Sequence, residues 1–78
     1  MRIELDEAAD ALYVVLSDAP YAYGKDLDDS RRIDYSEDGS VIGIEILFPS
    51  QGVNLKDLPL PESVLRELQR DRRLEFVA

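Results

Sequence analysis

The strongest constraint on the fold is the stretch from Arg31 to Phe48, in which apolar and polar residues alternate on both sides of Asp38-Gly39. An Asp-Gly pair is typical of a two-residue type I′ hairpin turn, because both central positions of that turn need a positive φ. The β-branched content of Val41 to Phe48 favours strand over helix. The stretch therefore predicts a β-hairpin with its turn at Asp38-Gly39.

The two-residue loop also predicts which residues face each other. It places apolar residues opposite one another on one face and sets Arg32 opposite Glu45, as a salt-bridge pair, on the other face. The expected cross-strand pairs are Tyr35 with Ile42, Ile33 with Ile44, Arg32 with Glu45 and Asp34 with Gly43. A three-residue loop, Glu37-Asp38-Gly39 with Gly39 in a bulge, is the alternative, but it would oppose Asp34 to Ile42 and mix the two faces.

Three further strands and one helix are expected. Short apolar-alternating runs predict strands over Arg2 to Leu5, Ala11 to Ser17 and Tyr21 to Leu27. Ala11 to Ser17 is apolar on both faces, which is typical of a central strand. A helix is expected from Pro61 to about Arg72, because proline suits the first helical turn and the apolar residues that follow have helical spacing. The apolar tail after it is strand-like and is expected to pair with a sheet edge, either in this molecule or in a neighbour.

These elements predict an α+β fold, in which an antiparallel β-meander of four to five strands carries one C-terminal helix packed on one face. The chain of 78 residues is expected to form a single domain. Residues 1–50 would form an acidic β-sheet portion, residues 51–60 a connector, and residues 61–78 the C-terminal helix and tail.

The composition excludes several classes of site and partner. The chain has no cysteine and no histidine, so it lacks disulfides, thiolate ligands and the commonest proton shuttle. Its formal net charge of -8 lies entirely in residues 1–55, which hold twelve Asp/Glu against four Lys/Arg. Such a surface disfavours nucleic acid and favours a basic protein partner. No apolar run reaches the roughly 18 residues of a membrane span, and the first residues lack a signal peptide's apolar core, so we expect a cytoplasmic protein without membrane contact.

The acidic turns are the nearest approach to a metal or acid-base site. They are Asp6, Glu7 and Asp10 in one turn and Asp26, Asp28 and Asp29 in another, and Asp34 is a further carboxylate beside a tyrosine. Carboxylates suit Ca²⁺ or Mg²⁺, but the spacing lacks the loop of an EF-hand. We therefore assign no catalytic, cofactor-binding or metal residues and expect no cofactor, and we keep a carboxylate enzyme as the alternative. That alternative predicts that two or more of Asp6, Asp10, Asp26, Asp28 and Asp34 converge in one concave pocket.

Four tyrosines in a chain without tryptophan indicate an interaction surface, because tyrosine buries a large ring and keeps a polar tip. The candidate residues are Tyr13, Tyr21, Tyr23 and Tyr35. The doubly apolar strand and the small core also predict a homodimer, in which a second subunit covers what one helix cannot.

Two motifs resemble a known family. They are the segment Asp6 to Tyr13, with Leu16-Ser17 after it, and the segment Asp34 to Leu47, which contains Asp-Tyr-Ser-Glu-Asp-Gly and Val-Ile-Gly-Ile-Glu-Ile-Leu. Over roughly residues 1–50 the chain resembles the small prokaryotic family filed as domain of unknown function 2283. The resemblance implies a short, mainly β bacterial or archaeal domain without assigned catalytic residues, and it suggests an antitoxin-like partner of a small toxin as one role. With the acidic surface, it favours a non-catalytic protein-binding or regulatory module.

Overall fold

The structure, a computed structural model, describes residues 1–77 and has an α+β fold. The strands of the main sheet are β1 (Arg2–Asp6), β2 (Ala11–Val15), β3 (Tyr23–Asp26), β4 (Arg31–Tyr35) and β5 (Val41–Leu47). The elements that follow are a 3-10 turn η1 (Pro49–Gln51), β6 (Val53–Asn54), the helix α1 (Glu62–Arg70) and β7 (Phe76–Val77). The predicted fold class is thus confirmed, with β2, β3 and α1 shorter than expected.

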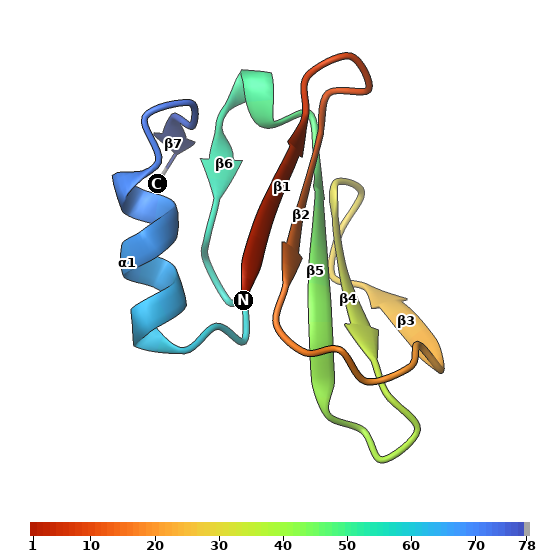
Figure 1. The fold of residues 1–78 in the computed structure, drawn as a ribbon. Helices are drawn as coiled ribbons and strands as arrows, with labels where there is room; N and C mark the ends of the chain where they lie inside the picture. The colour runs from red at the N-terminus through yellow and green to blue at the C-terminus, as the bar shows by residue number, and fades with distance from the viewer. Residues whose placement is uncertain (78) are drawn as a thin grey trace.

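The order of strands in the sheet corrects the predicted meander. All neighbours are antiparallel, but the order is β1-β2-β5-β4-β3, so the chain crosses from β2 to the far edge before it returns (Figure 1). The interior position predicted for β2 is kept, but its second neighbour is β5 and not β3. The short β3, which carries Lys25 and Asp26, is polar and suits an exposed edge.

The hairpin between β4 and β5 closes with the alternative three-residue loop. The Gly39 N–H donates to the Ser36 carbonyl (3.0 Å), the Ser36 N–H donates to the Ser40 carbonyl (2.9 Å), and Gly39 has φ 86°. The two-residue loop is therefore wrong. A bulge restores the predicted register by pairing Tyr35 with Val41 and leaving Ile42 as an extra residue.

Beyond this bulge the predicted pairing is correct. Arg32 lies opposite Glu45, Ile33 opposite Ile44, and Asp34 opposite Gly43. The pair of Tyr35 with Ile42 is not formed, because the bulge shifts the register between Asp34 and Tyr35.

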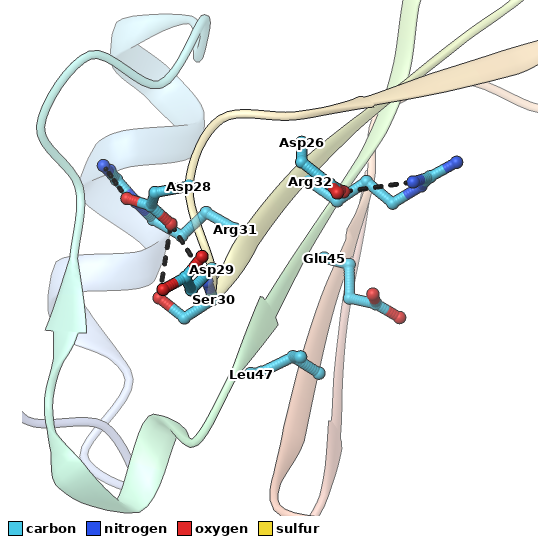
Figure 2. Close-up of a pocket in the computed structure, with 8 residues that line it drawn as sticks. All are labelled: Asp26, Asp28, Asp29, Ser30, Arg31, Arg32, Glu45 and Leu47. Carbon is cyan, nitrogen blue, oxygen red and sulfur yellow. Dashed lines mark hydrogen bonds and ion pairs between the residues drawn. The ribbon is translucent and has the colours of Figure 1, made fainter.

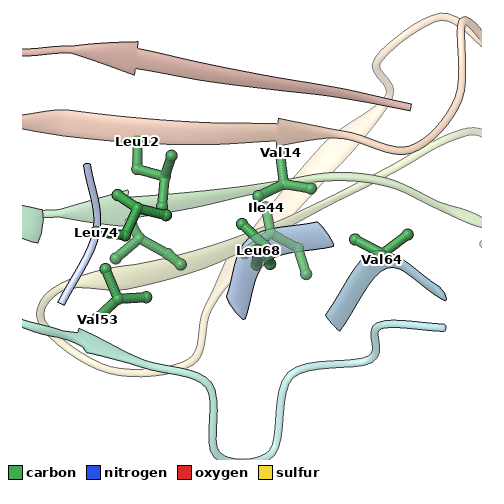
Figure 3. Packing of buried hydrophobic residues seen from close by; sticks show 8 residues of the cluster. Leu12, Val14, Ile44, Val53, Val64, Leu68 and Leu74 are labelled. Atoms are coloured by element: carbon green, nitrogen blue, oxygen red, sulfur yellow. The ribbon is translucent and has the colours of Figure 1, made fainter. Parts of the chain in front are cut away.

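The hydrophobic core lies between one face of the sheet and the C-terminal segment (Figure 3). Its members from the sheet are Leu12, Val14, Ile44 and Ile46, and its members from the C-terminal segment are Val53, Val64, Leu68 and Leu74. The helix thus covers the apolar face as predicted. The tail pairs in parallel with β6 in a separate two-stranded sheet and not with an edge of the main sheet. No helix among the described residues is long and apolar enough to cross a bilayer.

Arg31 ties this C-terminal segment to the sheet. Its side chain is only 8% exposed, and its Nη1 donates to the backbone carbonyls of Asn54 (3.1 Å) and Lys56 (2.5 Å). Its Nε and Nη2 donate to Asp28 Oδ2 at 2.9 and 2.7 Å. A buried guanidinium with all these acceptors is well satisfied and holds the connector in place.

Candidate functional site

The side of the sheet opposite α1 is covered by no helix or strand of the described residues (Figure 1). We call its side chains the open face, and they follow from the strand registers and from period-two alternation. The open face consists of Arg2, Glu4, Asp6, Ala11, Tyr13, Val15, Gly24, Asp26, Arg32, Asp34, Gly43, Glu45 and Leu47.

The centre of the open face is a tyrosine lying across a glycine. Tyr13 Oη donates to Asp34 Oδ2 at 2.7 Å, and a Cβ at Gly43 would lie only 2.5 Å from Tyr13 Cζ. The ring therefore occupies the space that the missing side chain of Gly43 leaves. Burial and the adjacent Asp34 carboxylate raise the pKa of Tyr13 well above its usual value, so the phenol stays a neutral hydrogen-bond donor.

Asp34 is a buried carboxylate at the same place. It is 9% exposed, and while Oδ2 accepts from Tyr13, Oδ1 is buried without a hydrogen bond. Arg32 Nε lies 3.5 Å from Oδ1, which is an ion pair too long for a good hydrogen bond. Tyr13 and Arg32 together stabilise the charge that this burial would otherwise disfavour.

Arg32 does not make the predicted salt bridge with Glu45, although the two lie opposite each other. Its guanidinium instead lies 3.1 Å from Asp26 Oδ1 and donates to Tyr21 Oη at 3.2 Å. Gly24, which lies opposite Asp34, leaves the room for this, since a Cβ there would lie 2.6 Å from Arg32 Nε. These hydrogen bonds raise the pKa of Arg32 further. Among the described residues, Glu45 is consequently left without an ion pair.

One row of side chains crosses the whole open face. Successive strand partners place in line Glu4 of β1, Tyr13 of β2, Glu45 of β5, Arg32 of β4 and Asp26 of β3. Glu45 is the middle member and is half-buried on the central strand. A carboxylate thus stands on either side of the Tyr13 ring.

A cavity of about 430 Å³ adjoins this row at the β3–β4 turn (Figure 2). It is lined by Asp26, Asp28, Asp29, Ser30, Arg31, Arg32, Glu45 and Leu47. Two of the five carboxylates named for a converging site, Asp26 and Asp28, do lie here, but each is bound by an arginine. No three acidic, histidine or cysteine side chains of residues 1–77 are placed to hold a metal ion.

Of the other three carboxylates in the predicted set, Asp34 lies at the centre of the open face. Asp6 and Asp10 flank the β1–β2 turn, at the opposite edge of the sheet from β3. Asp6 Oδ1 caps that turn by accepting from the Ala9 N–H at 3.0 Å. Asp10, at φ 50°, accepts from the backbone N–H (3.0 Å) and the hydroxyl (2.6 Å) of Ser50. The contact of Asp10 with Ser50 joins residues forty positions apart, and no pattern in the sequence predicted it.

The structure separates the four tyrosines into two pairs. Tyr13 and Tyr21 belong to the hydrogen-bond network around Arg32 and Asp34. Tyr23 and Tyr35 stack with ring centroids 5.0 Å apart, on the face that carries Ile33. Glu45 and Gly43 were not predicted as site residues. The predicted register could have identified them, because it already placed them opposite Arg32 and Asp34.

Comparison with known proteins identifies the family. Residues 2–50 match a family described as protein of unknown function, DUF2283. Searches of curated proteins and of solved structures found no match. The matched residues include β1 to β5, and with them the entire open face. Because the match covers more than half of the chain, this protein belongs to the DUF2283 family.

Proposed function

We propose that this protein is a non-catalytic binding module that recognises a protein partner with its open face. The observation that carries the proposal is a five-stranded sheet face without a covering element, in which half-buried apolar groups are surrounded by charges. The apolar groups are Tyr13, Val15 and Leu47. An aromatic and aliphatic centre with a polar rim is the usual composition of a protein-protein interface.

The charge states of the acidic groups support a non-catalytic role. In the cavity, Arg31 lowers the pKa of Asp28, so this carboxylate is ionised at neutral pH and cannot act as a general acid. Tyr13 is held neutral and is already engaged with Asp34. Neither group has a pKa near neutrality, where proton transfer would be efficient.

A regulatory role in the cytoplasm is the form of this function that we favour. A module of this kind acts by occupying a surface of its partner, as an antitoxin-like protein does. The alternative, a metal-dependent or acid-base enzyme, is supported by Asp26 and Asp28 lining one cavity. It requires heat on calorimetric titration with Ca²⁺ or Mg²⁺, and a titration without heat would remove the metal-dependent form.

Affinity capture from the organism that encodes the protein tests the proposal when it includes matched variants. Leu47→Ser removes an apolar side chain from the open face, and Phe76→Ser removes one from β7 outside that face. Loss of an interface contact worth about 1.4 kcal/mol weakens binding about tenfold. We expect a stoichiometric partner to be retained by the wild type and by Phe76→Ser and to be lost from Leu47→Ser. Equal retention by both variants would contradict the proposal.

A further inference from the structure

We infer that the partner of the open face is a basic protein segment and that Glu45 receives one of its cationic side chains. The inference rests on the proposed function and adds the chemistry of the partner. It follows from the charges of the open face, from the unpaired state of Glu45 and from the groups beside it.

The charges on the open face are unbalanced. Its strands carry five carboxylates, Glu4, Asp6, Asp26, Asp34 and Glu45, against the two guanidiniums of Arg2 and Arg32. Arg32 is already shared between Asp26 and Asp34. A surface with this excess attracts cations and repels phosphate, so charge complementarity selects a basic segment.

Glu45 is the position at which a cationic side chain of such a segment should add most to the binding free energy. It lies on the central strand, is half-buried and has no ion pair among residues 1–77. Figure 2 draws the arginines of the cavity bound to Asp26 and Asp28, whereas no interaction reaches Glu45. A half-buried carboxylate is incompletely hydrated and gains from a cation that replaces the lost water.

The neighbours of Glu45 suit a long basic side chain. The Tyr13 ring is its partner on β2, and Leu47 is the next residue on the same side of β5. These groups offer apolar surface to the methylene stem of arginine or lysine, while the carboxylate meets the charged end.

Glu4 provides a second carboxylate in the same row. It lies two strands from Glu45, on the other side of Tyr13, which corresponds to about 10 Å. Its ion pair with Arg2 (3.2 Å) is between exposed groups and costs little to exchange. The segment is therefore expected to present two cations about 10 Å apart.

A second copy of this chain does not fit the same face. Two open faces brought together would oppose the same excess of carboxylates and would repel one another. The basic segment is for this reason the occupant that the structure favours.

The test uses a blocked hexa-arginine peptide as the probe, with a blocked hexa-glutamine peptide as its uncharged control. Two-dimensional NMR of the full chain follows the backbone amides during titration. We expect hexa-arginine to shift amides near Glu4, Tyr13 and Glu45 and hexa-glutamine to shift none. Removal of one partly exposed charge pair weakens binding about fivefold, so we expect that loss in Glu45→Gln.

Glu67→Gln is the matched control, because it makes the same chemical change in α1, on the other side of the sheet. We expect less than a twofold effect from it. Equal weakening by both variants, or equal shifts around α1, would show that the peptide follows net charge and would overturn the inference. Sedimentation of a dimer that Glu45→Gln dissociates would assign the face to a second copy and overturn it as well.

The outcome is separable from that of the proposed function. If Leu47→Ser abolishes capture of the partner while Glu45→Gln changes neither capture nor peptide binding, the open face still binds a protein. Only its basic chemistry would then be wrong.

Discussion

Gly43 is the position where one added methyl group should damage the open face most. A Cβ in Gly43→Ala would lie 2.5 Å from Tyr13 Cζ and 2.9 Å from Tyr13 Cε2, so the ring must move. Overpacking of this kind costs about 1–3 kcal/mol, and loss of the hydrogen bond from Tyr13 to the Asp34 carboxylate costs about 1.5–3 kcal/mol. Alanine also lowers the conformational entropy of the unfolded chain relative to glycine, which offsets at most about 1 kcal/mol of this loss.

The net loss expected for Gly43→Ala is therefore about 3 kcal/mol of unfolding free energy. A chain of this length has a total of only about 4–12 kcal/mol. Urea denaturation followed by far-ultraviolet circular dichroism measures the change. The circular dichroism spectrum before unfolding shows whether the variant retains the sheet.

A double-mutant cycle with Tyr13→Val isolates the cause. In that background no ring lies over residue 43, so Gly43→Ala should cost less than about 0.5 kcal/mol, which is the range of a substitution without a specific conflict. An equal cost of Gly43→Ala in both backgrounds would refute the idea that Tyr13 makes glycine necessary here.

Other features of the molecule make further predictions. The pKa of Tyr13 is raised, so the 295 nm titration difference between the wild type and Tyr13→Phe should have its midpoint above pH 10; a midpoint at 10 or below contradicts the burial described. Hydrogen bonds from Ser36 and Ser40 lower the pKa of Asp38 to about 2, so its contribution to stability should be complete above about pH 4 and be lost as the pH falls toward 2. Asp38→Asn, compared with Glu37→Gln, should remove that part of the acid dependence of urea unfolding. Arg31→Met should cost about 2–3 kcal/mol and speed amide exchange in residues 53–57, and unchanged exchange there would contradict its role as a tether. The homodimer stays a prediction, although the charges of the open face argue against that face as its interface, and sedimentation at micromolar concentration giving the mass of one chain would count against it.

The alternation of apolar and polar residues predicted the pairing of β4 with β5, because the register of a single hairpin with one buried face is set by residues close together in the sequence. Arg32, Ile33 and Asp34 have the expected partners for this reason. The predicted two-residue loop was wrong because a glycine at position 39 suits both a type I′ turn and a three-residue loop. The bulge at Ile42 was not predicted; at this residue the N–H groups of both Leu16 and Ser17, from a distant segment, donate to the carbonyl (2.9 and 3.2 Å).

The site was less predictable than the strands, because its chemistry depends on pairings between distant segments. Opposition across strands suggested a bridge from Arg32 to Glu45, but the guanidinium turns to Asp26 because Gly24 of β3 leaves room. That choice needs the β3–β4 register, which the weak pattern of residues 21–27 did not define. The tyrosines were found by composition, whereas their division between two faces required the register.

The sheet face that packs against the C-terminal segment lies within the family match, which ends at residue 50. The side chains that cover this face all come later in the chain. Val53, Val64, Leu68 and Leu74 all belong to the stretch beyond the match. A chain that ended at Ser50 would expose Leu12, Val14, Ile44 and Ile46 to solvent, so it would have to bury them in an interface with another molecule. The oligomeric state of residues 1–50 alone would therefore not carry over to the whole chain.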